Sequence, residues 1–84
     1  MAFNGLEALY LSADISNGAL STYAFNEAQI NSIELYGASS SNAYIADNAF
    51  YGLSTFGIAF PDVDDFSSIS SKISNAGIAP FVQV

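Results

Sequence analysis

The last third of the chain, residues 58–84, constrains the fold most, because its sequence IAFPDVDDFSSISSKISNAGIAPFVQV favours a strand, a helix and a second strand in succession. Asp62 can cap the free backbone N–H groups of a first helical turn, and the acidic residues after it suit the positive end of the helix dipole. Apolar residues then recur at spacings of three and four, which predicts one buried helix face: Val63, Phe66, Ile69 and Ile73.

The end of this helix and the strand after it are also marked. Lys72, the only basic side chain of the chain, suits a last helical turn, and Asn75 and Gly77 suit its end. Pro80 cannot donate to a sheet ladder, so the final strand is predicted at a sheet edge. Two strands joined by one helix should pair in parallel.

The first two thirds of the chain leave alternatives open. Residues 6–15 alternate between apolar and polar side chains, which favours a strand over the helix that a capping box at Asn4 and Glu7 would start. Residues 19–29 are predicted as the first helix, and residues 30–38 as the second strand, with a second helix as the alternative. Residues 53–60 favour a strand with Phe56, Ile58 and Phe60 on one face, and residues 38–52 stay unassigned.

This order of elements predicts one α+β domain, residues 1–84, with the βαββαβ arrangement of ferredoxin-like folds. Residues 31–50 are also similar to a coil of a parallel β-helix. One coil cannot bury a core, and the internal echoes (GIAF with GIAPF, EALY with IELY) lack a solenoid period, so we prefer the ferredoxin-like fold.

Three segments resemble the ACT domain, a small ligand-binding module that usually works in pairs. DISNGAL at 14–20 resembles the family's D-x-P-G-x-L loop, INSI at 30–33 resembles its I-N-I segment, and KISNAGI at 72–78 with VQV at 82–84 resembles its final helix and strand. The resemblance implies an amino-acid-like ligand near Asn17, Gly18 and Asn31 at a dimer interface of a cytoplasmic protein.

The composition excludes several classes of partner. Eight acidic residues against one Lys, with no Arg or His, give a net charge of −7, which argues against binding nucleic acid or an anionic membrane. No apolar run approaches the roughly 20 residues that span a bilayer. The N-terminus has no basic start, so it does not resemble a signal peptide, and the absence of Cys excludes disulfides and thiolate metal sites.

The chemistry-bearing residues predict no enzyme and no cofactor. Asp62, Asp64 and Asp65 could attract Ca²⁺, but an EF-hand spacing is missing, and we interpret the motif as helix capping. Serine is abundant, yet the chain has no His to act as its base. The remaining carboxylates show no pairing that would favour acid–base catalysis: Glu7, Asp14, Glu27, Glu34 and Asp47.

The surface composition favours a structural role. Only 11% of the residues are charged, against about a quarter in an average domain, and small polar and aromatic residues dominate. Such a surface costs little to desolvate, and tyrosine is enriched at interfaces. We therefore expect a non-enzymatic subunit that assembles with copies of itself or with another structural protein, in a virion or an extracellular filament. The candidate interface residues are Tyr10, Tyr36, Tyr44, Tyr51 and Phe81.

Overall fold

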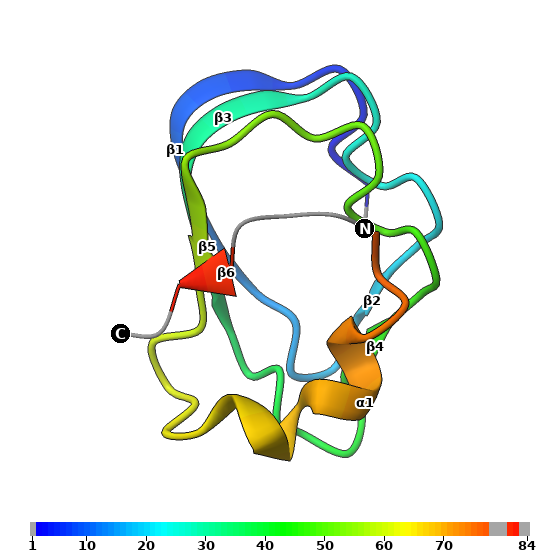
Figure 1. The fold of residues 1–84 in the computed structure, drawn as a ribbon, viewed down its shortest axis with the longest axis vertical. Helices are drawn as coiled ribbons and strands as arrows, with labels where there is room; N and C mark the ends of the chain where they lie inside the picture. The colour runs from blue at the N-terminus through cyan, green and yellow to red at the C-terminus, as the bar shows by residue number, and fades with distance from the viewer. Residues whose placement is uncertain (1, 78–80, 83–84) are drawn as a thin grey trace.

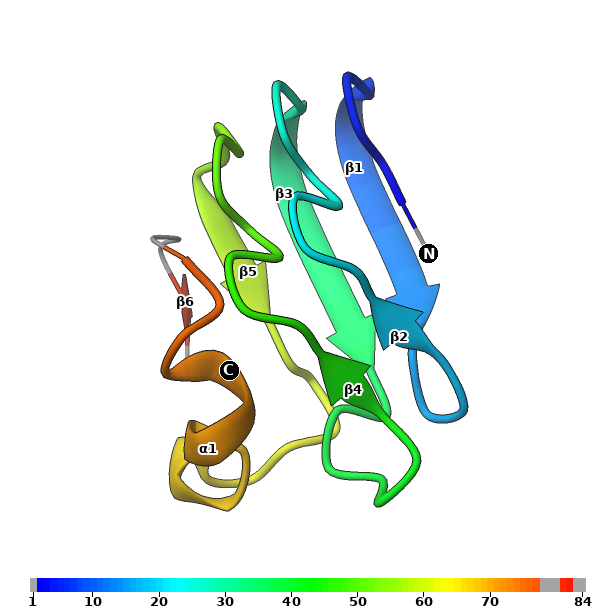
Figure 2. The same cartoon turned by 90° about the vertical axis from the view of Figure 1, so that its right-hand side faces the viewer.

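The computed structural model describes residues 2–77 and 81–82, and its main feature is a sheet of four parallel strands. The strands lie in the order of the sequence: β1 (Glu7–Asp14), β3 (Gln29–Tyr36), β5 (Gly57–Ala59) and β6 (Phe81–Val82). Figure 2 shows β1, β3 and β5 side by side, with β6 beyond β5. Parallel neighbours that follow one another in sequence require the chain to return to the same end of the sheet after each strand.

The register between strands shows how long each return is. Glu7 pairs with Gln29, which is 22 residues later, Ser32 pairs with Gly57 after 25 residues, and Ile58 pairs with Phe81 after 23. Coils of roughly 20 to 29 residues with one such strand each are also the units of leucine-rich-repeat solenoids. The architecture is therefore that of a short solenoid, in which each coil contacts only its neighbours.

A second wall closes the solenoid opposite this sheet, as Figure 1 shows. It holds the short parallel strands β2 (Ala19–Leu20) and β4 (Tyr44–Ile45), followed by turns whose backbone groups bond from coil to coil. The N–H of Phe3 donates to the carbonyl of Ala24, that of Phe25 to Ala49, and that of Phe50 to Ala76.

The core between the two walls contains a stack of phenylalanine rings. The ring centroids of Phe3 and Phe25 are 5.0 Å apart, and those of Phe25 and Phe50 are 5.4 Å apart, both pairs nearly parallel. Phe81 meets Phe50 edge-on at 5.6 Å. Around the stack lie fully buried aliphatic side chains from both walls: Ile15, Leu20, Ile30, Ile33, Leu35, Ile58 and Ile69.

The ferredoxin-like expectation is therefore wrong. The strands are all parallel, and helix is limited among the described residues to one 3₁₀ turn, η1 (Phe66–Ser68), and one α-helical turn, α1 (Ser70–Ile73). Two of the predicted strands are confirmed, because β1 lies within residues 6–15 and β3 nearly matches residues 30–38. The rejected similarity to a parallel β-helix coil described residues 31–50 better, since each coil buries its core against the next.

The helix predicted at residues 19–29 does not form. The chain there makes β2 and then tight turns, with left-handed backbone at Tyr23 (φ 60°) and Glu27 (φ 65°). The N–H groups of Tyr23, Phe25 and Glu27 donate to the next coil rather than back along a helix. Hydrogen bonding between coils thus replaces the helical hydrogen bonds that the local spacing favoured.

The C-terminal unit is right in outline and wrong in detail. Strands β5 and β6 pair in parallel and β6 is an edge strand, as predicted, whereas residues 78–80 and 83–84 of the predicted strand lie outside the described residues. The helix cap is Asp65, whose Oδ1 accepts from the N–H of Ser67 at 2.9 Å. Asp62 instead accepts from the N–H of Gly37 at 2.8 Å, and so ties the corners of two coils together.

Candidate functional site: the outer face of the sheet

The outer face of the sheet carries the most exposed large apolar side chains of the described residues. Strand β1 presents Leu9, which is 78% exposed, and the segment leading into β5 presents Phe56, which is 84% exposed. The register places Asn31 of β3 between them, so the three form a row across neighbouring strands. Adjacent strands lie about 4.8 Å apart, so the row is about 10 Å long between its end backbones.

Such exposure has a local cause in the strands. In β3 the buried side chains are Ile30, Ile33 and Leu35, so two consecutive residues between Ile30 and Ile33 face solvent. Strand β1 repeats this pattern at Leu9 and Tyr10. The step removes Leu9 from the core side that strict alternation would have given it, and it places the apolar row outside.

A small hollow of about 130 Å³ lies beside Phe56. Its lining combines the ring with amide and hydroxyl side chains: Gln29, Asn31, Ser54, Thr55 and Phe56. Thr55 Oγ1 donates to the backbone carbonyl of Asn31 at 3.2 Å, which holds the rim in place. The hollow can take a small polar or apolar group of a partner, and it is too small for a cofactor-sized ligand.

A carboxylate between two tyrosines lies further along the same face. The Tyr10 hydroxyl donates to Oε1 of Glu34, and Tyr36 follows Glu34 by two residues on the same side of β3. The hydrogen bond to Glu34 raises the pKa of the Tyr10 phenol above its ordinary value. Tyr10 and Tyr36 keep 54% and 36% of their surface exposed, so both rings are open to a partner. We use "outer sheet face" for Leu9, Tyr10, Asn31, Glu34, Tyr36 and Phe56.

The residues predicted for an amino-acid ligand do not come together. Asn31 lies on the outer sheet face, whereas Asn17 and Gly18 lie in the corner loop that follows β1. In that loop Asn17 Oδ1 accepts from Asn42 Nδ2 at 3.2 Å, and the carbonyl of Gly18 accepts from the N–H of Tyr44. Asn17 and Gly18 therefore hold two coil corners together.

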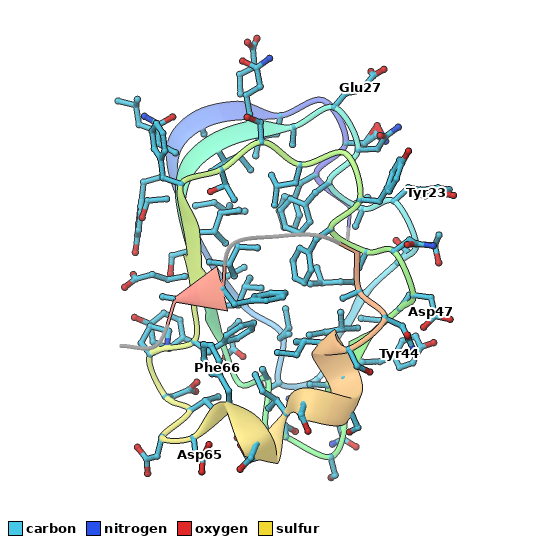
Figure 3. All side chains as sticks on the ribbon, viewed as in Figure 1. Tyr23, Glu27, Tyr44, Asp47, Asp65 and Phe66 are labelled. Carbon is cyan, nitrogen blue, oxygen red and sulfur yellow. The ribbon has the colours of Figure 1, made fainter. Side chains whose placement is uncertain are left out.

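The predicted interface residues divide among three places. Tyr10 and Tyr36 lie together on the outer sheet face. Tyr44 projects from the opposite wall, as Figure 3 shows, and Tyr51 packs edge-on against Tyr23 of that wall at 5.4 Å. Phe81 is part of the core, where its ring contacts those of Phe50 and Phe60.

The opposite wall has a hollow of its own, about 430 Å³ in volume. Its lining is polar throughout: Asp47, Asn48, Ser74, Asn75 and Gly77. Across the described residues, no three acidic side chains, the only metal-ligating type in this sequence besides none of His or Cys, gather into a metal site. The Asp62, Asp64 and Asp65 motif accordingly includes two carboxylates that bind backbone N–H groups of the chain itself, those of Asp62 and Asp65.

Sequence reasoning missed the two residues that dominate this face. Leu9 was expected inside with Leu11, and Phe56 was expected to share a buried face with Ile58 and Phe60. Glu34 was expected to be an unremarkable surface carboxylate. The available signal was the repeated two-residue step in β1 and β3, which strict alternation hides.

Comparison with known proteins adds no relative: neither a family model, nor a curated protein, nor a solved structure matches the chain. Within residues 2–77 and 81–82, no helix has the length and apolar character needed to cross a membrane.

Proposed function

We propose that this chain is a non-enzymatic structural module that attaches to the surface of another protein through its outer sheet face. The observation that carries the proposal is the row of Leu9, Asn31 and Phe56, whose two apolar members are more than three-quarters exposed. Large apolar side chains gathered on one exposed face mark contact surfaces, and solenoids commonly bind partners along a strand face. Such a module would decorate a larger assembly, for which a virion or an extracellular filament is the proposal that the composition favours.

The electrostatics favour another protein over a second copy. Each copy has a net charge of −7, and Glu34 lies on the face itself, so pairing two such faces would bring like charges together. A structural role also agrees with the carboxyl pKa shifts. Backbone N–H groups lower the pKa of Asp14 and of Asp65, whereas a general acid at neutral pH needs a raised pKa.

The proposal is tested with the double variant Leu9→Ser/Phe56→Ser and a control, Tyr44→Ser, which changes an exposed ring on the opposite wall. A benzophenone side chain at position 56 or 44 is used to cross-link partners from the source material, and each captured protein is then purified. We expect the position-56 partner to bind the wild type and the Tyr44→Ser variant, and to lose binding to the double variant.

Light scattering of the purified chain supplies the second arm. A monomer agrees with attachment to a different protein. Large regular assemblies that disappear in the double variant would assign the face to contacts between copies, and assemblies that survive in it would remove the face from the proposal altogether. Stabilisation by a small molecule that depends on Asn31 would instead favour a ligand-binding module.

A further inference from the structure

The outer sheet face also indicates what kind of partner fits it, an inference that rests on the proposed function above. Glu34 is half-buried, and its carboxylate lies against Tyr10, whose hydroxyl donates to it. The register sets Ser12 opposite Glu34 and Asp14 opposite Tyr36, so a second carboxylate follows on the neighbouring strand. An anion flanked by open tyrosine rings is a suitable environment for a cation, because both carboxylates and aromatic faces attract positive charge.

The negative charge of this face has no cationic side chain to balance it. Lys72 is the only Lys or Arg of the sequence, and His is absent. Its Nζ donates to the carbonyls of Ala38 and Ser40 at 2.7 and 2.6 Å, and thus serves a coil corner. Anionic partners such as phosphate groups would meet repulsion on the outer sheet face, whereas a cationic side chain would meet attraction.

The distance between the two parts of the face suits an extended chain. The apolar row crosses β3 at Asn31, and Glu34 lies three residues further along, about 10 Å at a rise of roughly 3.3 Å per residue. An extended segment along the strands would therefore place a basic side chain on Glu34 and an apolar one on the row some three residues away.

We propose that the outer sheet face binds a basic, extended segment of a partner protein, with an arginine or lysine on Glu34 beside the rings of Tyr10 and Tyr36 and an apolar side chain against Leu9 and Phe56. Each contact has its counterpart on the face, and the chain's own charge selects against the acidic alternatives.

The test compares two variants that change the net charge equally, Glu34→Gln and Glu27→Gln. Glu27 lies on the wall away from the β1–β3–β5 sheet, at the upper right of Figure 3. The probe is a labelled five-residue peptide that alternates Arg and Leu, with a Glu–Leu peptide as its partner control, followed by fluorescence anisotropy. We expect Glu34→Gln to weaken Arg–Leu peptide binding about tenfold and Glu27→Gln less than about twofold. The Glu–Leu peptide should not bind.

Chemical-shift mapping on the wild type keeps the test independent of the variants. Peptide-induced shifts should concentrate at Leu9, Glu34 and Phe56, and shifts spread evenly over both walls would overturn the proposal. Equal weakening by both charge variants would do so too, because it would reduce the effect to net charge. If Glu34→Gln binds normally while Leu9→Ser/Phe56→Ser loses the captured partner, the cationic preference fails and the proposed function stands. If neither variant loses the partner, both fail.

Discussion

Three residues other than glycine adopt left-handed backbone, and they occupy equivalent places in successive coils. Tyr23 (φ 60°) and Asn48 (φ 59°) each precede an Ala-Phe pair, and Glu27 (φ 65°) follows one. Asparagine tolerates this conformation through local hydrogen bonds, whereas longer side chains pay for the close approach of Cβ to the backbone. The equivalent neighbours of Glu27 in the adjoining coils are Gly5 (φ 73°) and Gly52 (φ 79°).

Replacing Glu27 by Gly should therefore stabilise the fold by about 1 kcal/mol, since the strain removed exceeds the added chain entropy of glycine. The matched change Gly52→Ala should destabilise it by more than about 1 kcal/mol. A Cβ on Gly52 would lie 2.2 Å from Oδ1 and 3.2 Å from Cα of Asn26. Urea denaturation measures both. A destabilised Glu27→Gly variant would contradict the equivalence of these positions.

Asp65 predicts a pH dependence whose sign follows from its cap. The Ser67 N–H lowers the pKa of Asp65, so the carboxylate stabilises the folded state above its ordinary pKa of 3.8, and this contribution is lost as the pH falls through the lower, folded-state pKa. Asparagine at position 65 keeps an oxygen acceptor but does not titrate. We expect the wild type to exceed Asp65→Asn in free energy of unfolding at about pH 6, and the difference to shrink below about pH 4. A difference that is constant with pH would refute the linkage. Asp14 titrates alike in both proteins and cancels.

At the scale of elements, the sequence predicted what local pattern decides and failed where distant segments decide. Strands β1 and β3 follow from their apolar residues, because each side chain choice there agrees with a half-buried strand. Residues 19–29 have helical spacing, yet their N–H groups bond to the next coil, which no local pattern reveals. The outer sheet face was predicted in part, at Tyr10, Tyr36 and Asn31. Leu9 and Phe56 escaped because exposure of an apolar residue is a property of the assembled sheet.

Lys72 connects two elements that are far apart in sequence. Its ammonium group on α1 donates to two carbonyls of the loop between β3 and β4, at Ala38 and Ser40. This loop lies in the coil with the longer, 25-residue spacing from Ala19 to Tyr44 and has few other hydrogen bonds among the described residues: Ser40 to Gly37, Ala43 to Ser40 and Asn42 to Ser40 and Asn17. The single cation of the chain therefore orders a corner.

The variant Lys72→Met keeps the aliphatic stem and removes both charge-assisted hydrogen bonds. We expect it to destabilise the fold by about 2 kcal/mol and to raise amide hydrogen exchange in residues 38–43. Ser71→Ala, a neighbouring exposed change on the same helix, should stay within about 0.5 kcal/mol of the wild type. Unchanged exchange in the loop would show that the lysine does not restrain it.

At the scale of the whole molecule, the solenoid was visible in the sequence as a repeated Ala-Phe pair. The pairs at residues 2–3, 24–25 and 49–50 are spaced by 22 and 25 residues, the same spacings as the strand registers. The shorter echoes GIAF and EALY hid this period because they align segments that do not stack. Three similar coils share one core, which answers the objection that a single coil cannot bury its own.

The phenylalanine stack predicts how the coils depend on one another. Phe25 is fully buried between Phe3 and Phe50, whereas Phe3 is partly buried at the end of the stack. Phe25→Ala should cost about 3–5 kcal/mol, a large part of the roughly 4–13 kcal/mol expected for a domain of 84 residues. Phe3→Ala should cost less than half as much, because it removes contacts on one side only. Thermal and urea unfolding followed by circular dichroism measures both variants. Equal losses would mean that the coils do not share one core. A partly folded Phe25→Ala variant, with β3 and β5 still protected from amide exchange, would mean that the coils unfold separately rather than as one cooperative unit.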